Sequence, residues 1–379
     1  MKQLIIIAIA LASTNAFATR ARVAALGNSP HLIDTQTVYS NPADMMVLGD
    51  YVNFESGTTA AGAEGSNTEG MITRSMGDAK MGLSLGHLSK NASLFGLRNP
   101  TLSGIATIKA QQNPVELSYG MKMGDMSWAG TLVYSNYKDK VATTDEKESS
   151  MGLRFGLRMG ALDAKLGLGL GNEYSHATNG KFKGTMGVSL GAGYWMDTLY
   201  FSGNIVMAGF KTESTAGVEQ RKYDNQDIML SVVNNHKKEG NLEGLFYGVG
   251  LSNVTSKLTL SSATPPSDIK TTTMSLPIWL GMETEATSWM VLRGSVTQNV
   301  FLSSSKQETT PTAGGTDFEF APGVNTTVAS VGAGLKFNKV TVDGAIVGLT
   351  TGGTGVLGAA TQQLDGNQLL TKVGMTYMF

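Results

Sequence analysis

The feature that most constrains the fold is an alternation of apolar with small or charged residues, repeated every two positions along most of the chain. Residues 151–159, MGLRFGLRM, alternate in this way, and residues 162–170, LDAKLGLGL, do so again. A period of two places alternate side chains on opposite faces of a β-strand. Because two-residue connections are typical of tight antiparallel turns, we expect an all-β antiparallel protein. Such connections occur at Gly124-Asp125, Gly160-Ala161, Met196-Asp197 and Asn338-Lys339.

The connections at the opposite strand ends are long and rich in Ser, Thr, Asn, Gly and Lys. Short turns at one end and long polar loops at the other are typical of a transmembrane β-barrel of the outer-membrane type. Alternating directions give about sixteen strands, the first two near residues 50–60 and 66–76, and an even number places both termini in the periplasm. The predicted loops are residues 89–112, 139–147, 212–223, 255–270, 303–324 and 351–367.

Composition restricts the alternatives to this barrel. Glycine makes up 47 of 379 residues, which disfavours long helices. The net charge of -1 offers no general basic surface, so nucleic acid is not an expected partner. A soluble sandwich or propeller would also alternate, but it would not keep short turns and long loops at separate ends. The expected surroundings are therefore outer-membrane lipid.

Residues 1–18 have the features of an export signal. Lys2 precedes an apolar run over residues 4–12, and Ala16-Phe17-Ala18 supplies small residues for cleavage after Ala18. The run is too short to span a bilayer. We therefore expect a signal peptide (1–18), an N-terminal segment (19–46) and a transmembrane β-barrel (47–379), located in the outer membrane of a Gram-negative-type envelope.

The chain ends in LLTKVGMTYMF, residues 369–379, which also alternate. A closed barrel must pair its last strand with its first, because unpaired backbone groups are costly in hydrocarbon. Tyr377 and Phe379 share one face, and the terminal aromatic resembles the signal by which outer-membrane barrels are recognised by their assembly machinery. We expect that machinery to be a partner. The alternative is that Phe379 belongs to the aromatic girdle at the membrane interface.

The segment 19–46 lacks clean alternation and is too long for a simple lead-in to the first strand. Asn41-Pro42-Ala43, with Asp34 seven positions ahead and Arg22 near the start, resembles the N-terminal segment of the FadL family of transporters for hydrophobic compounds. The resemblance implies that this segment is a hatch that plugs the barrel. Because the family barrel has about fourteen strands, we expect 14 to 16 strands in this chain.

The sequence departs from the family pattern in two places. Asn28-Ser29 stands where the family usually has a glycine pair, and Ile33-Asp34 stands where it has two adjacent acids. The alternative to a hatch is that the Asn-Pro pair makes an ordinary turn leading into a strand.

Four basic residues alternate with apolar ones, so we expect them to face the lumen rather than lipid. A Lys or Arg on the lipid face near the bilayer midplane would cost about 2–4 kcal/mol. A basic zone of this kind would attract anionic solutes or the carboxylate of an amphipathic molecule, with Trp289 and Phe301 as apolar lining. The alternative is a watery lumen with solvated charges of both signs. The four residues are Arg154, Lys165, Arg293 and Lys372.

No pattern indicates catalysis. The four histidines have no metal-ligand spacing, and none can be paired with a serine from sequence. We therefore expect neither an enzyme nor a cofactor. The predicted function is a channel for passive uptake of hydrophobic or amphipathic small molecules. The alternatives are a general diffusion porin, or a structural or adhesive barrel whose outer loops carry the function.

Overall fold

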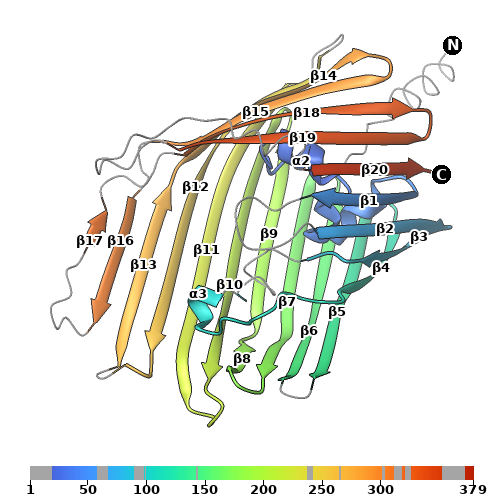
Figure 1. Ribbon diagram of the computed structural model, residues 1–379. Helices are drawn as coiled ribbons and strands as arrows, with labels where there is room; N and C mark the ends of the chain where they lie inside the picture. Colours follow the sequence, from blue (N-terminus) through green and yellow to red (C-terminus); the bar gives the residue numbers. More distant parts are fainter. Residues whose placement is uncertain are drawn as a thin grey trace, which may run out of the picture.

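A computed structural model describes residues 19–57, 67–88, 98, 100–141, 144–236, 242–263, 266–300, 304–310, 318–320, 326–351 and 372–379. The predicted signal peptide lies outside the described residues. In the described part of the chain, no helix is long and apolar enough to cross a membrane. The chain instead forms one large sheet that curves back on itself (Figure 1).

Twenty strands belong to this sheet, and they follow one another around it in sequence order. The strands are β1 (Tyr51–Gly57), β2 (Asn67–Met76), β3 (Ala79–Leu85), β4 (Val115–Met123), β5 (Met126–Val141), β6 (Thr144–Met159), β7 (Leu162–His176), β8 (Gly180–Gly184), β9 (Gly187–Met196), β10 (Leu199–Glu213), β11 (Glu219–His236), β12 (Leu242–Leu260), β13 (Ser267–Ser275), β14 (Pro277–Thr287), β15 (Met290–Asn299), β16 (Ser304–Thr310), β17 (Phe318–Phe320), β18 (Thr326–Phe337), β19 (Val340–Thr351) and β20 (Lys372–Met378).

The sheet closes because β1 pairs with both β2 and β20: Val52 lies opposite Ile72 on one side and Tyr377 on the other. Several neighbouring strands are two parts of one wall strand. Both β8 and β9 pair with β7 and β10, and both β13 and β14 pair with β12. In the same way, β15 and β16 are two parts of one wall strand, and β17 and β18 are two parts of the next. Counted as wall strands, the described residues form a closed antiparallel barrel of sixteen, the upper end of the predicted range.

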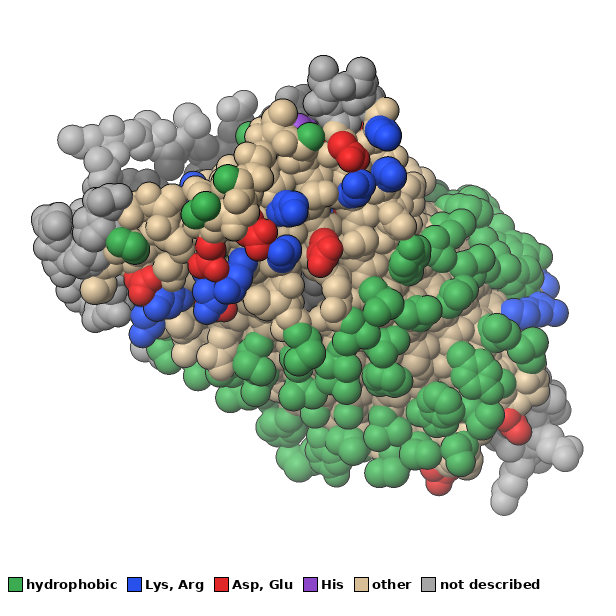
Figure 2. All heavy atoms as spheres, turned by 90° about the horizontal axis from the view of Figure 1, so that it is seen from below, with side chains coloured by type: hydrophobic (Ala, Val, Ile, Leu, Met, Phe, Trp, Pro, Cys, Tyr) green, Lys and Arg blue, Asp and Glu red, His purple; other side chains and the backbone are tan. Residues whose placement is uncertain are grey.

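The two faces of the wall differ as the alternation predicts. On β5, Leu132 and Tyr134 are exposed on the outside. Thr131 and Ser135, which flank them along the strand, are buried on the inside. The outer surface carries a broad apolar area (Figure 2). An exposed apolar face this large is stable only in contact with lipid, so the barrel spans a membrane.

Several predicted connections differ from the structure. The tight turn after β9 is Asp197-Thr198, one residue later than expected. The predicted loop 139–147 is instead mostly strand, since β5 and β6 stay paired as far as Val141 and Thr144. The strands β10 to β13 likewise extend into the predicted loops 212–223 and 255–270, as β16 and β17 do into 303–324. Beyond the hydrocarbon the outward positions need not be apolar, so these paired strands have the composition of loops. Nearly all of 351–367 lies outside the described residues.

Short helices lie inside the barrel wall (Figure 1). Three belong to the N-terminal segment: α2 (Arg20–Ala25), η1 (Thr37–Tyr39) and η2 (Pro42–Met46). A fourth, α3 (Pro100–Ser103), belongs to the connection between β3 and β4.

Candidate functional site: the barrel lumen

The residues Asn41-Pro42-Ala43 begin a helical turn rather than lead straight into a strand. The Asn41 side-chain oxygen accepts a hydrogen bond from the Ala43 amide at 3.2 Å, which caps η2. Pro42 occupies the first helical position, where its missing N–H leaves no donor unpaired. We call residues 19–46 the hatch segment.

The hatch segment rests directly on glycines of the wall. A Cβ atom at Gly156 of β6 would lie 2.0 Å from the Asn41 side-chain oxygen and 2.6 Å from the Ala43 nitrogen. A Cβ at Gly332 of β18 would lie 2.6 Å from the Ala25 side chain. The small inward residues of the alternating pattern therefore leave the space that the hatch backbone fills.

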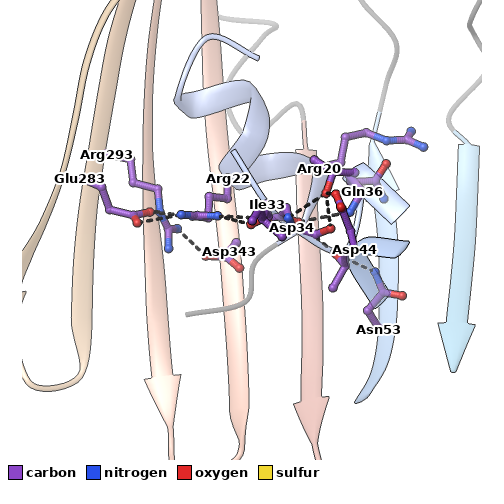
Figure 3. Close-up of polar contacts among 12 residues, drawn as sticks. Arg20, Arg22, Ile33, Asp34, Gln36, Asp44, Asn53, Glu283, Arg293 and Asp343 are labelled. Atoms are coloured by element: carbon purple, nitrogen blue, oxygen red, sulfur yellow. Dashed lines mark hydrogen bonds and ion pairs between the residues drawn. The ribbon is translucent and has the colours of Figure 1, made fainter. Parts of the chain in front are cut away.

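Arg22 connects the hatch segment to the wall through carboxylates (Figure 3). Its guanidinium lies 3.1 Å from Asp34 of the hatch, and it donates two hydrogen bonds to Glu283 of β14, at 2.8 and 3.0 Å. Arg293 of β15 in turn donates to Glu283 and to Asp343 of β19. Two-pronged Arg–carboxylate contacts fix geometry as well as charge.

A second polar cluster joins the hatch to β1 and β2. The Arg20 amide donates to Glu55 at 2.7 Å, and its guanidinium pairs with Glu69. The Gln36 amide donates to both carboxylates, at 2.7 and 2.6 Å (Figure 3). Two carboxylates this close repel each other, and the donors that they share reduce this repulsion. The hatch therefore supplies part of the charge and hydrogen bonding that stabilises Glu55 and Glu69 of the wall.

A third contact lies on β6, where Arg158 donates to Asp44 at 2.7 Å. Lys165 of β7 is nearby and partly buried, and among the described residues its ammonium has no ion-pair or hydrogen-bond partner. Its aliphatic chain lies against Gly191, where a Cβ would meet the Lys165 Cε at 2.6 Å and the Asn204 oxygen at 2.9 Å. The nearby Asp163 accepts a hydrogen bond from Tyr200 at 3.0 Å instead.

The predicted basic residues face inward, and the two arginines among them lie beside acidic partners. Arg154 is 2% exposed and pairs with Glu116 at 2.5 Å, and Arg293 is paired as described above. Lys372 is partly buried on the inward side of β20. Buried charges require partners because leaving water is costly, and acids on adjacent strands supply them. Trp289, predicted as lumen lining, lies half-exposed in the turn between β14 and β15, and Phe301 lies outside the described residues.

Burial changes the proton affinity of the hatch groups. Burial raises the pKa of Asp34 from 3.8 to about 7, although Arg22 beside it acts in the opposite direction. Burial and the charge of Arg22 lower the pKa of His31 from 6.5 to about 4. At Arg22, Glu283 and Asp34 outweigh burial, so the pKa is raised and the guanidinium stays charged. Asp34 is thus the hatch group whose charge changes near neutral pH.

A cavity of about 530 Å³ remains between the hatch segment and the wall strands β6 to β11. Its apolar lining includes Val23 and Leu32 of the hatch and Met229 of the wall. Lys165 and Asp227 are charged wall residues of its lining. The cavity therefore offers an apolar side and an unpaired ammonium. Among the described residues, no group of three or more His, Asp or Glu side chains is placed to hold a metal ion.

A second segment, which the sequence pattern did not predict, also enters the lumen. We call Arg98 with residues 100–112 the outer-loop segment. Arg98 is buried, pairs with Glu148 at 2.8 Å, and donates to the Asn172 side chain at 2.7 Å. Ile105 and Ile108 pack in an apolar cluster with inward aromatic residues of the wall, namely Tyr174, Phe182 and Phe210. The sequence signal for this packing is the presence of two isoleucines in a mostly polar loop.

The ladder of backbone pairs between β7 and its neighbours β8 and β9 is interrupted at one place. β7 pairs with β9 through Leu162–Gly169 and with β8 through Glu173–His176, but no ladder pair joins the described residues 170–172 to 184–186. A Cβ at Gly171 would meet no atom within 4 Å. Leu170 and Met186 are exposed on the outside at this point.

The terminal strand closes the barrel with its aromatic residues outward. Tyr377 is 40% exposed and Phe379 47% exposed, and their rings meet edge to face at 5.5 Å. The Phe379 amide donates to the Asp50 carbonyl at 3.1 Å, which joins the last residue to the start of β1. Both aromatics are thus positioned at the lipid-facing seam.

No protein-family model matches the sequence, and no curated protein matches it. Similar solved structures include the CymD monoaromatic hydrocarbon channel, at 11% identity and TM-score 0.43, covering 96% of this chain and 98% of that chain. A Pseudomonas aeruginosa FadL homologue matches at 11% identity and TM-score 0.42, covering 96% and 98%. The toluene transporter TodX of P. putida matches at 11% identity and TM-score 0.34, covering 96% and 99%.

A FadL homologue is thus among the solved structures that this chain matches. The chain itself is an outer-membrane-type β-barrel.

Proposed function

We propose that this barrel is an outer-membrane channel that admits hydrophobic or amphipathic small molecules passively, with the hatch segment as its movable plug and both termini in the periplasm. The observation that carries the proposal is the docking of the hatch through Arg20, Arg22 and Asp44 onto charged wall residues, beside a cavity of mixed polarity. Side chains held by charges in a watery lumen can exchange their partners for water or ligand.

The cavity favours an amphipathic ligand with one acidic end. The Lys165 ammonium is available to a carboxylate, while Leu32, Val206 and Met229 line the space that an apolar tail would fill. Replacing Lys165 with Gln should weaken uptake of a fatty carboxylate several-fold and leave a neutral analogue of the same length unaffected. Equal loss for both probes would contradict an anchoring role.

The interrupted ladder between β7 and the β8/β9 pair supports a sideways route between cavity and lipid. A larger side chain at Gly171 would not touch the hatch, since no atom lies within 4 Å of a Cβ there. For a hydrophobic molecule such a route avoids the aqueous exit.

We also propose that Phe379, together with Tyr377, is the assembly signal for the barrel. Deleting Phe379 should leave export intact and impair membrane insertion, because the seam between β20 and β1 must close in lipid. Normal membrane levels with heat-modifiable gel migration would contradict this.

A second candidate, a general diffusion porin, is favoured by the outer-loop segment, because a loop folded inward narrows a pore. Single-channel conductance separates the two functions. The protein lacking residues 19–46 should conduct several-fold more than the intact protein if the hatch is the plug. If deletion changes nothing and the Arg98→Gln variant instead opens the pore, the porin function is the better description.

A further inference from the structure

A band of lysines surrounds much of the barrel on its outer face, near the strand ends opposite the tight turns. These residues face outward because their neighbours along the strands, such as Phe182, Phe210 and Tyr223, pack in the lumen. We call this set the lysine band: Lys138 of β5, Lys147 of β6, Lys181 and Lys183 of β8, Lys211 of β10, Lys222 of β11, Lys257 of β12 and Lys270 of β13.

Members of the lysine band lie directly opposite one another across the strands. Lys211 faces Lys183 on one side and Lys222 on the other. Lys138 faces Lys147, and Lys257 faces Lys270. Like charges directly opposite destabilise a sheet, so this arrangement requires anions nearby.

Carboxylates on the same face supply only some of these anions. Five lysines each have one acidic partner, at 2.8 to 3.3 Å. Lys138, Lys181 and Lys270 have no ion pair among the described residues. The acidic partners are Asp145, Glu213, Glu219, Asp224 and Asp268. A positive excess therefore remains on this band, although the whole chain has a net charge of -1.

The lysine band begins where the apolar surface ends (Figure 2). On β10, the exposed outward residues Phe201, Ile205 and Met207 are followed by Lys211. Lys211 is four positions beyond Met207, about 13 Å along a strand. On β5, Tyr134 precedes Lys138 by the same interval. This is the depth at which lipid headgroups border the hydrocarbon.

An apolar hollow of about 530 Å³ lies on the same strands within the apolar surface. Gly203 of β10 lies in the outward row and has no side chain, so it forms the floor of the hollow. Residues of β7, β9, β10 and β11 also line it, including Leu166, Leu190, Ile205 and Ile228. A molecule with both phosphates and acyl chains could thus place one on the band and the other in the hollow.

We propose that the lysine band and this hollow form a binding surface for a phosphorylated, multiply acylated glycolipid of the outer leaflet. The proposal rests on the orientation given above, with both termini in the periplasm, but not on the transport activity. Lys138, Lys181 and Lys270, which have no ion pair among the described residues, bind phosphate oxygens, and these balance the positive excess on the band. The hollow takes up acyl chains.

The test measures thermal unfolding of the full mature barrel by heat-modifiable gel migration. The barrel is placed in phosphatidylcholine vesicles, with or without bis-phosphorylated lipid A. The midpoint for the wild type should rise by several degrees in lipid A. The Lys138→Gln/Lys181→Gln variant removes two lysines that have no ion pair among the described residues, so it should match or exceed the wild type in phosphatidylcholine alone. It should lose the lipid A increment.

A matched variant, Lys122→Gln/Lys339→Gln, removes two lysines at the tight-turn end and should keep the increment. Inorganic phosphate added to phosphatidylcholine vesicles separates the sources of the anion: an equal increment there would overturn the lipid assignment. No increment in lipid A, or equal loss in both variants, would mean that the lysines are only solvated surface charges. Conductance plays no part in this readout, so failure of the hatch would be a separate result.

Discussion

Two segments fill the lumen of this barrel, and they differ in how many ion pairs hold them there. The hatch segment has several ion pairs, through Arg20, Arg22 and Asp44, beside apolar clusters that it shares with the wall. The outer-loop segment has one buried cation, Arg98, beside an apolar cluster that includes Ile105. Losing one partner of a buried ion pair leaves an uncompensated charge, whereas an apolar cluster loses stability in proportion to the area removed. The hatch should therefore respond to pH and charge more strongly than the outer loop does.

The largest expected effect separates the two segments by removing one arginine from each. Arg22→Met should release the hatch, because it removes the two hydrogen bonds to Glu283 of the wall and leaves the buried carboxylates one cation short, at a cost of about 3–5 kcal/mol to docking. The chain has no cysteine, so Ser29→Cys and Ser103→Cys can report on the two segments, being 4% and 2% exposed. Thiol labelling at Ser29→Cys should accelerate at least a hundredfold, and labelling at Ser103→Cys should not change.

Arg98→Met provides the reciprocal measurement. It should accelerate labelling at Ser103→Cys and leave Ser29→Cys slow, because Arg98 contacts the wall and its own loop rather than the hatch. If either substitution released both segments, the two would form a single plug and the comparison would fail.

A smaller effect should follow from filling a glycine site beneath the hatch. Gly156→Val would force the Asn41 and Ala43 contacts apart, and overpacking of this kind costs about 1–3 kcal/mol. Gly171→Val is the matched control, since nothing lies within 4 Å of its Cβ. Labelling at Ser29→Cys should accelerate in the first variant only. Equal rates in both would show that the hatch does not rest on β6.

The smallest expected effect is on pH dependence. Because burial raises the pKa of Asp34 from 3.8 to about 7, docking takes up a proton. Docking is therefore fully favourable below about 3.8 and weakens as the pH rises through about 7. Labelling at Ser29→Cys, normalised to the denatured chain at each pH, should accelerate between these values. Asp34→Asn should remove the dependence, and the outer-loop reporter should show none. A flat profile in the wild type would contradict the assignment to Asp34.

The alternation predicts the barrel because each strand has one face toward lipid and the other toward the lumen. This pattern is set within each strand, so it can be read from a short stretch of sequence. It also predicts that Arg154 and Arg293 face inward. It does not reveal Glu116, Glu283 and Asp343 as their partners, because pairing depends on the register between strands. The sequence predicts loops where the strands extend beyond the membrane, because the outward residues there are polar.

The outer-loop segment was missed for a different reason. Its two isoleucines have no period, and their partners on β7, β8 and β10 come together only once the barrel closes. The segment 19–46 was singled out by its Asn41-Pro42-Ala43 resemblance, but the wall glycines that it contacts carry no side-chain signal in the sequence.

The central claim is that the hatch must move for a molecule to pass, and a reversible cross-link tests it most directly. A Cβ at Gly27 would lie 3.4 Å from the Ser295 Cβ of β15, close to the separation in a disulfide. The Gly27→Cys/Ser295→Cys protein should fail to take up a hydrophobic probe when oxidised and should recover on reduction, while each single variant is unaffected by oxidant. Unchanged uptake in the fully cross-linked protein would contradict the account.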